Sequence, residues 1–319
     1  MSTVEDTFKF DPSYGYTPEE LLQVGAPEGP GDFDSFWQKR YKRALVVSPR
    51  PRIKDTGETI NGARIFKITH RSTEAAVIGG WLTLPENGVI NRGFVVGHGY
   101  GGREGPDLHL PFKDAAILFP CARGISRSPY PNVSPDPGWH VIHDLADPNR
   151  YIIGHCVEDI WLAASTLIRL FPQVQGHLGY LGISFGGGIG AMAMAFDDRY
   201  QKAHFNVPTF GNQPLRLELP TTGSGAAVQV FHKRYPEQTQ NTLKYYDAAI
   251  SASRMKIPTH YACALYDPMV APPGQFAIYN QTQSPKQLYT LTAGHYEYED
   301  QAKEDAELLS ELDVFFSDL

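Results

Sequence analysis

The segment 182–186, which reads Gly-Ile-Ser-Phe-Gly, places a serine where it could act as a nucleophile. It follows an apolar run at 178–182 and opens into a glycine-rich, helix-like stretch at 186–196. A serine on such a strand-to-helix turn is held in a strained backbone with its hydroxyl exposed. The helix N-terminus also points its amide groups toward developing negative charge. These features predict that Ser184 is the nucleophile of an acyl-transfer reaction.

A serine hydroxyl needs a base to take its proton, and the base needs a carboxylate to orient it. Asp267 follows an apolar run at 259–265 and precedes a proline, which favours a loop. His295 lies between a strand-like segment at 287–292 and the last helix-like stretch, and of 11 histidines only His260 and His295 lie beyond residue 232. The chain order Ser, Asp, His is that of α/β-hydrolases. We therefore expect Asp267 as the acid and His295 as the base.

Backbone amides that stabilise the oxyanion are expected from two places. Phe185 directly follows the nucleophile and supplies one donor. The segment 97–102, Gly-His-Gly-Tyr-Gly-Gly, follows an apolar run at 93–96, and its glycines let the backbone approach a substrate. We assign the second donor to Tyr100, because no Gly-Lys-Ser/Thr ending supports a phosphate loop. We also expect Tyr100, Pro208 and Phe210 to bind the substrate and limit the size of its acyl group.

Short apolar runs that alternate with helix-like stretches position these residues. The runs lie at 93–96, 115–119, 178–182 and 259–265, and the helical stretches at 157–171, 186–196, 274–281 and 301–316. This pattern predicts a mostly parallel sheet with helices on both faces, an α/β-hydrolase fold. Alternating runs at 63–69 and 75–84 predict antiparallel strands at one edge. A helix begins near residue 36, with Asp34 or Ser35 as N-cap.

The domain organisation is expected to be simple. Residues 1–35 are rich in Pro, Gly and acidic residues and predict an irregular N-terminal arm. Residues 36–319 then form a single domain, with an excursion over the active site around 209–250. The last helix carries an apolar stripe at Ala306, Leu309, Leu312 and Phe316.

Composition excludes several classes of function. The 319 residues include 28 Lys+Arg and 35 Asp+Glu, a net charge of −7, with 42% hydrophobic residues. This balance is that of a globular protein, and no basic cluster suits a nucleic acid. Neither a secretory signal nor a membrane span is apparent, so we expect a cytoplasmic protein with no membrane partner.

Cysteines and histidines do not suggest a metal or a disulfide. Cys121, Cys156 and Cys263 are far apart and are expected to be buried reduced thiols. His140, His143, Asp144 and His155 are crowded, but no His-Glu-x-x-His helix is present. We expect ordinary hydrogen bonds there, no metal and no cofactor.

Several motifs in order resemble the acetyl xylan esterases and cephalosporin-C deacetylases of the α/β-hydrolase superfamily. They are Asp-Phe-Asp-Ser-Phe-Trp at 32–37, His-Gly-Tyr-Gly-Gly at 98–102, the elbow around Ser184, 242–247, 267–273 with Phe276, Tyr279 and Asn280, and Gly294-His295. The resemblance implies the same triad and the same oxyanion donors. It also implies a homo-oligomer, because family members form closed hexamers.

The chain departs from the family pattern away from the triad. Ile125-Ser126 replaces Gln-Gly after an Arg-Gly pair, and His143-Asp144 replaces a second Arg-Gly pair. The helix that follows starts without the family's Tyr/Arg-rich segment, and the loop from Asn206 to Phe210 lacks an acidic residue.

These observations predict a serine carboxylesterase that removes short acyl groups, mainly acetyl, from sugars, xylo-oligosaccharides or similar small alcohols. Its partner is a small-molecule ester. A general small-ester hydrolase or a peptidase is the alternative, because this fold hosts many chemistries. A non-catalytic ligand-binding homologue would be expected to have a broken triad.

Overall fold

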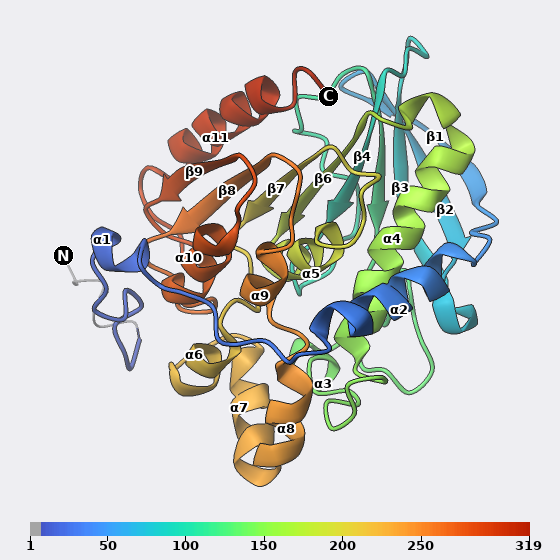
Figure 1. Ribbon diagram of the computed structural model, residues 1–319. Helices are drawn as coiled ribbons and strands as arrows, with labels where there is room; N and C mark the ends of the chain where they lie inside the picture. Colours follow the sequence, from blue (N-terminus) through green and yellow to red (C-terminus); the bar gives the residue numbers. More distant parts are fainter. Residues whose placement is uncertain (1–7) are drawn as a thin grey trace.

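A nine-stranded sheet runs through the computed structural model, which describes residues 8–319 (Figure 1). Its strand order is β1-β2-β3-β5-β4-β6-β7-β8-β9. Strand β1 pairs antiparallel with β2, β2 with β3 and β3 with β5, and the other pairs are parallel. The strands are β1 (Arg52–Ile60), β2 (Ala63–Arg71), β3 (Val77–Pro85), β4 (Arg92–Gly97), β5 (Ala115–Pro120), β6 (Leu178–Ile183), β7 (Lys202–Asn206), β8 (Thr259–Ala264) and β9 (Lys286–Leu291).

Helices cover the two faces of this sheet unequally. They are α1 (Pro18–Leu21), α2 (Phe33–Leu45), α3 (Pro137–His140), α4 (Ile152–Leu170), α5 (Phe185–Met194), α6 (Gln213–Glu218), α7 (Gly225–Arg234), α8 (Pro236–Leu243), α9 (Ala248–Ala252), α10 (Pro272–Gln281) and α11 (Gln301–Phe315). The described residues also include the 3-10 turns η2 (Thr73–Ala75) and η3 (Pro172–Val174). The large core includes α2, α4, α5, α9 and α10, and α11 covers the other face. The expected α/β-hydrolase architecture is confirmed.

Successive residues of the central strands enter different cores. Val95 of β4 and Tyr261 of β8 belong to the large core, whereas Phe94 and Ala262 belong to the core under α11. Because side chains alternate across a strand, a strand buried on both faces is apolar throughout. This explains why these strands are continuous apolar runs in the sequence.

Some elements differ from the sequence expectation. Strands β1 and β7 lie outside the apolar runs of the sequence: all but one of the nine residues of β1 are exposed, and β7 has only five residues. Helix α2 begins at Phe33, so its N-cap residue is Asp32 and not Asp34 or Ser35, and Asp32 makes no side-chain cap bond. The buried residues of α11 are Leu308, Leu312 and Phe315, so Ala306 is not part of the apolar stripe.

The N-terminal arm reaches toward the acid loop. From residue 8 to α2 it is irregular apart from the short helix α1, and residues 1–7 of the predicted arm lie outside the described part of the chain. The Asn280 side chain on α10 donates to the carbonyls of Leu21 and Val24 at 2.9 Å, and the Asp267 amide donates to the Pro12 carbonyl at 3.0 Å.

The segment between β7 and β8 is helical. It contains α6, α7, α8 and α9, and Figure 1 shows α6, α7 and α8 gathered at one end of the sheet. Helix α7 also contacts α3, and α6 contacts α10. This segment, expected as an excursion around 209–250, supplies one wall of the pocket described below.

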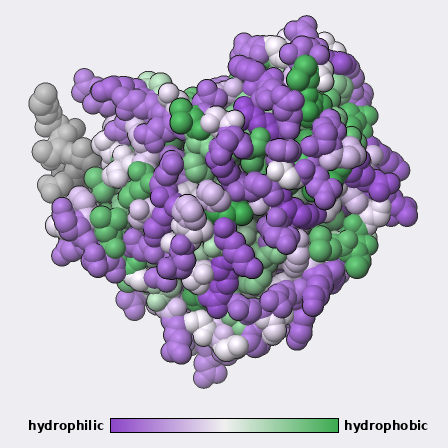
Figure 2. Space-filling view, turned by 45° about the horizontal axis from the view of Figure 1, so that its top comes forward, coloured by the Kyte–Doolittle hydropathy of each residue, from purple (hydrophilic) through white to green (hydrophobic). Residues whose placement is uncertain are grey.

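The surface in Figure 2 is mostly hydrophilic, with hydrophobic residues in separate groups. Within the described residues, no helix has both the length and the apolar character needed to cross a membrane.

Candidate active site

Ser184 lies at the turn between β6 and α5 in a strained backbone. Its φ is 53° and its ψ is −111°, a left-handed conformation that non-glycine residues rarely adopt. A side chain on Gly186 would come within 2.7 Å of the Gly97 backbone, so only glycine fits between this helix and β4. The turn is therefore the nucleophile elbow that the sequence predicts.

The structure brings the three expected triad residues together. His295 Nδ1 donates to Asp267 Oδ2 at 2.8 Å, and the Ser184 hydroxyl donates to His295 Nε2 at 2.9 Å. The hydrogen bond to Asp267 places the ring proton on Nδ1 and leaves the Nε2 lone pair free to accept the serine proton. This arrangement can make the serine oxygen nucleophilic.

Asp267 is fully buried, and four hydrogen-bond donors hold its carboxylate. The amides of Met269 and Val270 donate to Oδ1, each at 2.9 Å. The Gln275 side-chain amide donates to Oδ2 at 3.0 Å, next to the bond from His295. Gln275, which no pattern in the sequence marks, also accepts from the Ala264 amide through Oε1, and this fixes its orientation. The carboxylate is thus fixed in place for orienting the imidazole.

The two expected oxyanion donors are free to bind. Among residues 8–319, the backbone amides of Tyr100 and Phe185 donate to no acceptor. The loop that carries Tyr100 approaches the nucleophile, since a side chain on Gly99 would lie 3.9 Å from the Ser184 Cβ. Unpaired amides beside a nucleophile can stabilise the negative charge of a tetrahedral intermediate.

The Tyr100 side chain is held by a histidine at the end of α3. Its hydroxyl lies 2.9 Å from His140 Nδ1, and His140 Nε2 lies 2.8 Å from the Arg123 carbonyl. The carbonyl can only accept, so Nε2 carries the proton and Tyr100 donates to Nδ1. Burial lowers the pKa of His140 to about 4, which keeps the ring neutral near pH 7.

His98 holds the same loop from its other end. Nδ1 donates to the Gly99 carbonyl at 2.6 Å, and Nε2 accepts from the Ala122 amide at 2.9 Å. The His98 carbonyl also accepts from the Gly186 amide at 2.9 Å. Burial lowers the pKa of His98 to about 4, so this ring is neutral as well. The sequence motif shows where His98 lies, but its partners come from two separate segments.

A pocket of about 800 Å³ opens over the triad. Its walls come from the loop after β4, the start of α3, helices α6 and α7, and the acid and base loops. They include Ser184, His295, Tyr100, Thr209, Arg216, Ser224, Met269 and Val270. A volume of this size suits a small-molecule substrate.

Two residues that were expected on the pocket wall do not lie there. Pro208 lies behind the elbow, against Gly187, and is absent from the lining. Phe210 is buried, with its ring 6.1 Å from that of Phe185, and borders only a smaller adjoining cavity of about 30 Å³. The backbone of this loop turns at Val207 and Phe210, both with positive φ, and directs the side chains inward. Thr209 and Arg216 line the pocket instead.

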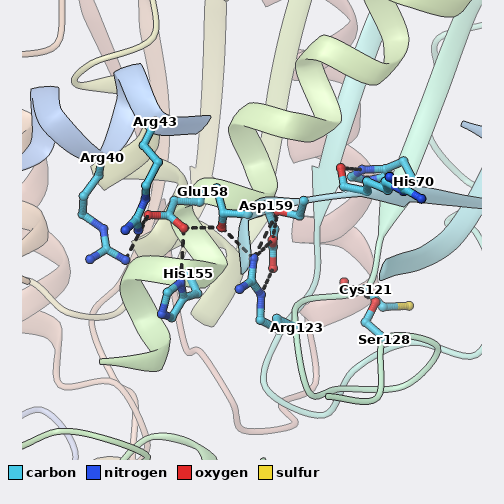
Figure 3. A network of polar contacts seen from close by, with 12 residues as sticks. Arg40, Arg43, His70, Cys121, Arg123, Ser128, His155, Glu158 and Asp159 are labelled. Carbon is cyan, nitrogen blue, oxygen red and sulfur yellow. Dashed lines mark hydrogen bonds and ion pairs between the residues drawn. The ribbon is translucent and has the colours of Figure 1, made fainter. Parts of the chain in front are cut away.

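A buried ionic network supports the loop that carries Arg123 (Figure 3). Arg123, fully buried, pairs with Asp159 on α4 at 2.7 Å, and its carbonyl accepts from His140. The neighbouring Glu158 pairs with Arg40 at 3.1 Å and with Arg43. These ion pairs join α2 to α4 next to the Arg123–Asp159 pair. Tyr100 is therefore connected through His140 and Arg123 to the helical layer.

The residues that depart from the family pattern make specific hydrogen bonds and an ion pair in the structure. Ser126 accepts from the Arg103 amide at 3.0 Å, next to the loop of Tyr100. Asp144 pairs with Arg150 at 3.0 Å. The Asn206 carbonyl accepts from the Ser184 amide at 2.8 Å, and the Thr209 amide donates to the Ser184 carbonyl at 3.1 Å. The loop at 206–210 thus holds the backbone of the elbow.

The remaining cysteines and histidines make ordinary contacts. Cys121, Cys156 and Cys263 are buried free thiols. His155 Nδ1 lies 3.2 Å from Glu158 Oε2. In the part of the chain that the structure describes, no three His, Cys, Asp or Glu side chains are grouped so that they could hold a metal.

An elbow serine with a bonded imidazole, on a mostly parallel sheet, is the architecture of the α/β-hydrolase class. Within that class the match is narrower, because a model of the acetyl xylan esterase family matches residues 19–311. The chain belongs to this family of serine ester hydrolases, as the sequence motifs implied.

Solved structures agree at the level of the fold. An acetyl xylan esterase from a Paenibacillus species is 22% identical with a TM-score of 0.83, covering 94% of this chain and 99% of that chain. An acetyl xylan esterase from a Thermoanaerobacterium species is 20% identical with a TM-score of 0.78, covering 95% and 99%. A Pyrococcus horikoshii acylaminoacyl peptidase is more distant, at 17% identity and a TM-score of 0.58, covering 86% of this chain and 42% of that chain.

Proposed function

We propose that the protein removes acetyl groups from small sugars or similar alcohols, with Ser184, His295 and Asp267 as nucleophile, base and acid. The observation that carries these roles is the chain of two hydrogen bonds from Ser184 through His295 to Asp267. The non-catalytic alternative predicts a broken triad, and this chain of bonds is intact.

The first half of the reaction forms an acyl-enzyme. Ser184 Oγ attacks the ester carbonyl carbon while its proton moves to His295 Nε2, and the carbonyl oxygen becomes an oxyanion. The amides of Tyr100 and Phe185 donate to this oxyanion. The C–O bond of the alcohol then breaks, and His295 gives its proton to the departing alkoxide. Asp267 stabilises the transient imidazolium.

The second half regenerates the serine. A water molecule gives a proton to His295 and attacks the acetyl carbonyl carbon, and the Ser184–acetyl bond breaks as His295 returns the proton to Ser184 Oγ. The products are free enzyme and acetic acid, which loses its proton to the solvent. His295 carries the proton in each transfer to or from Ser184, the alcohol and the attacking water.

A panel of substrates tests the proposal. It consists of acetyl, butyryl and octanoyl esters, acetylated xylo-oligosaccharides and an aminoacyl amide. We expect the acetyl esters to have the highest kcat/KM and the amide to be inert. Fast cleavage of the amide would favour the peptidase alternative. Equal rates on all three acyl lengths would favour a general small-ester hydrolase.

We also propose, from the family resemblance, that the chain forms a homo-oligomer, and we propose the cytoplasm as its location. Trp139 and Val230 are 68% and 69% exposed on α3 and α7, two helices that contact each other beside the pocket. An assembly of copies could bury these apolar side chains. Light scattering would test the oligomer, and a monomer at micromolar concentration would contradict it. Cell fractionation tests the location.

A further inference from the structure

Arg216 on α6 is the cation on the wall of the active-site pocket whose charge has no counterion. It lines the same pocket as Ser184, His295 and Tyr100. Its guanidinium forms no ion pair within the described residues, whereas Arg40, Arg43 and Arg123 all pair with acidic side chains. Burial lowers the pKa of Arg216, and no neighbouring carboxylate opposes this effect. An arginine nevertheless keeps its charge at neutral pH.

The position of Arg216 is fixed by neutral groups. Its carbonyl accepts from the Gln229 side chain at 2.9 Å. Nη1 donates to Gln213 Oε1 at 3.4 Å, and Gln213 is itself oriented by a bond to the Tyr246 carbonyl at 2.7 Å. The guanidinium carbon lies 5.1 Å from the centre of the Phe210 ring. The side chain is therefore positioned before any ligand arrives.

One edge of the Arg216 guanidinium has no hydrogen-bond acceptor among the described residues. Nε and Nη2 donate to no acceptor in residues 8–319, and both lie about 3.7 Å from where a Gly225 side chain would begin. Gly225 lines the same pocket, and its missing side chain leaves this edge uncovered. The Nε and Nη2 donors of arginine match the two oxygens of a carboxylate, which they bind with two parallel hydrogen bonds.

The acidic group that lines the pocket and the one behind His295 are both engaged elsewhere. Asp136 lines the pocket, but its carboxylate accepts from the amides of Gly138 and Trp139 at the start of α3. Asp267 is held by the four donors described above. Neither lies within ion-pair distance of Arg216.

We infer that Arg216 forms a subsite for a carboxylate on the alcohol part of the substrate, so that the preferred substrates are acetyl esters of acidic sugars such as hexuronic acids. This inference rests on the proposed function, because it places the acid group beside the ester that Ser184 attacks. Arg216 would then select, among the sugar esters that the triad can cleave, those that carry a carboxylate.

A matched pair of substrates tests the inference. Acetylated methyl glucoside and acetylated methyl glucuronide, acetylated at the same hydroxyl, differ only in CH2OH against a carboxylate. We expect the wild type to prefer the glucuronide in kcat/KM. Arg216→Gln should lower kcat/KM for the glucuronide by about tenfold to a hundredfold, the effect of losing a charge-assisted hydrogen-bonded pair. Turnover of the glucoside should change by less than about threefold.

Two further variants separate the geometry from the charge. Arg216→Lys keeps the charge but loses the two-pronged edge, so we expect only partial recovery of the preference. Arg234→Gln, on the exposed end of α7 and outside the pocket lining, removes the same charge and should leave the preference unchanged. If Arg216→Gln lowers both substrates equally, or if the wild type shows no preference, the inference is wrong.

Binding separates this inference from the proposed function. In Ser184→Ala protein, calorimetry with methyl glucuronide and methyl glucoside measures recognition without turnover. Tighter binding of the glucuronide, lost on adding Arg216→Gln, supports the subsite even if p-nitrophenyl acetate turnover by the wild type fails to support an esterase. Equal binding of the two probes contradicts the subsite while leaving the esterase untouched.

Discussion

The rings of Tyr100 and Phe185 stack on each other with centroids 4.2 Å apart and an angle of 29° between their planes. The same two residues carry the unpaired amides beside Ser184. They come from different strands, since Tyr100 follows β4 and Phe185 follows β6. The stack therefore adds to the backbone bond between the Gly186 amide and the His98 carbonyl in setting the distance between the two donors.

Substitutions of Tyr100 should separate the stack from its hydroxyl bond. Tyr100→Phe keeps the stack and removes the bond to His140, so we expect kcat to fall by about threefold to tenfold, the worth of one neutral hydrogen bond. Tyr100→Ala removes the stack and should lower kcat by about a hundredfold, as the loss of an oxyanion donor does. Steady-state kinetics on an acetyl ester measures both, with KM expected to change little. Equal losses in the two variants would contradict a role for the stack.

The acid and base should contribute unequally. His295→Ala should cost about as much in kcat as Ser184→Ala, because the two act as a unit. Asp267→Asn keeps the shape and loses the charge, and we expect kcat to fall by about a hundredfold to ten-thousandfold. Rapid-mixing kinetics on an activated acetyl ester measures both changes. If Asp267→Asn is silent, another carboxylate orients His295, and Glu297 is the first to examine.

The buried Glu158 should make stability depend on acid pH. Burial favours raising the pKa of Glu158, but the hydrogen bond from His155 and the charge of Arg40 outweigh it and lower the pKa to about 2, against 4.5 for a free side chain. A lowered pKa stabilises the fold above pH 4.5, and this contribution disappears as the pH falls toward 2. The shift corresponds to on the order of 3 kcal/mol in the free energy of unfolding.

Glu158→Gln should therefore destabilise the protein by about 3 kcal/mol at pH 7, with a smaller difference from wild type at pH 3. Denaturant midpoints at several pH values measure this. Glu74→Gln is the matched control, because Glu74 is exposed and lies 3.6 Å from the Arg43 that also binds Glu158. It should cost less than about 1 kcal/mol. A Glu158→Gln difference that stays constant with pH would contradict the lowered pKa.

Acyl length should matter because the region beneath the oxyanion donors is filled. Phe185 is fully buried, and its ring meets those of Tyr100, His140 and Phe210. A longer acyl chain must displace packed side chains or compete with the alcohol for the pocket, at about 1–3 kcal/mol for each methylene that finds no room. We expect kcat/KM to fall steeply from acetyl to butyryl to octanoyl esters. Faster turnover of octanoyl esters would contradict a small acyl site.

The sequence alone predicts the triad and the central sheet because local patterns mark them. Ser184 has its elbow glycines, and each central strand is apolar because both of its faces are buried. Strand β1 has no such pattern, since it lies exposed at the edge of the sheet, and only pairing with β2 makes it a strand. The pairing of His140 with Tyr100 joins residues 40 positions apart, and no spacing rule reveals it.

The residues that line the pocket are likewise not marked by local sequence patterns. The directions of the Pro208 and Phe210 side chains could not be predicted from the sequence, because they depend on the positive φ angles of Val207 and Phe210. Arg216 has the same local pattern as any surface arginine of a short helix. Its importance appears only when the partners of every other nearby charge are known.

Labelling of the nucleophile tests the central claim most directly. A fluorophosphonate reacts with an activated serine oxygen, and the site of the adduct is read by mass spectrometry of the digested protein. We predict one adduct, on Ser184, that is absent from Ser184→Ala and from His295→Ala, with acetyl ester turnover lost in both variants. Ser224→Ala, a serine of the same pocket wall, should label and turn over as the wild type does. An adduct on another residue, or acetyl ester turnover that survives in Ser184→Ala, would contradict the account.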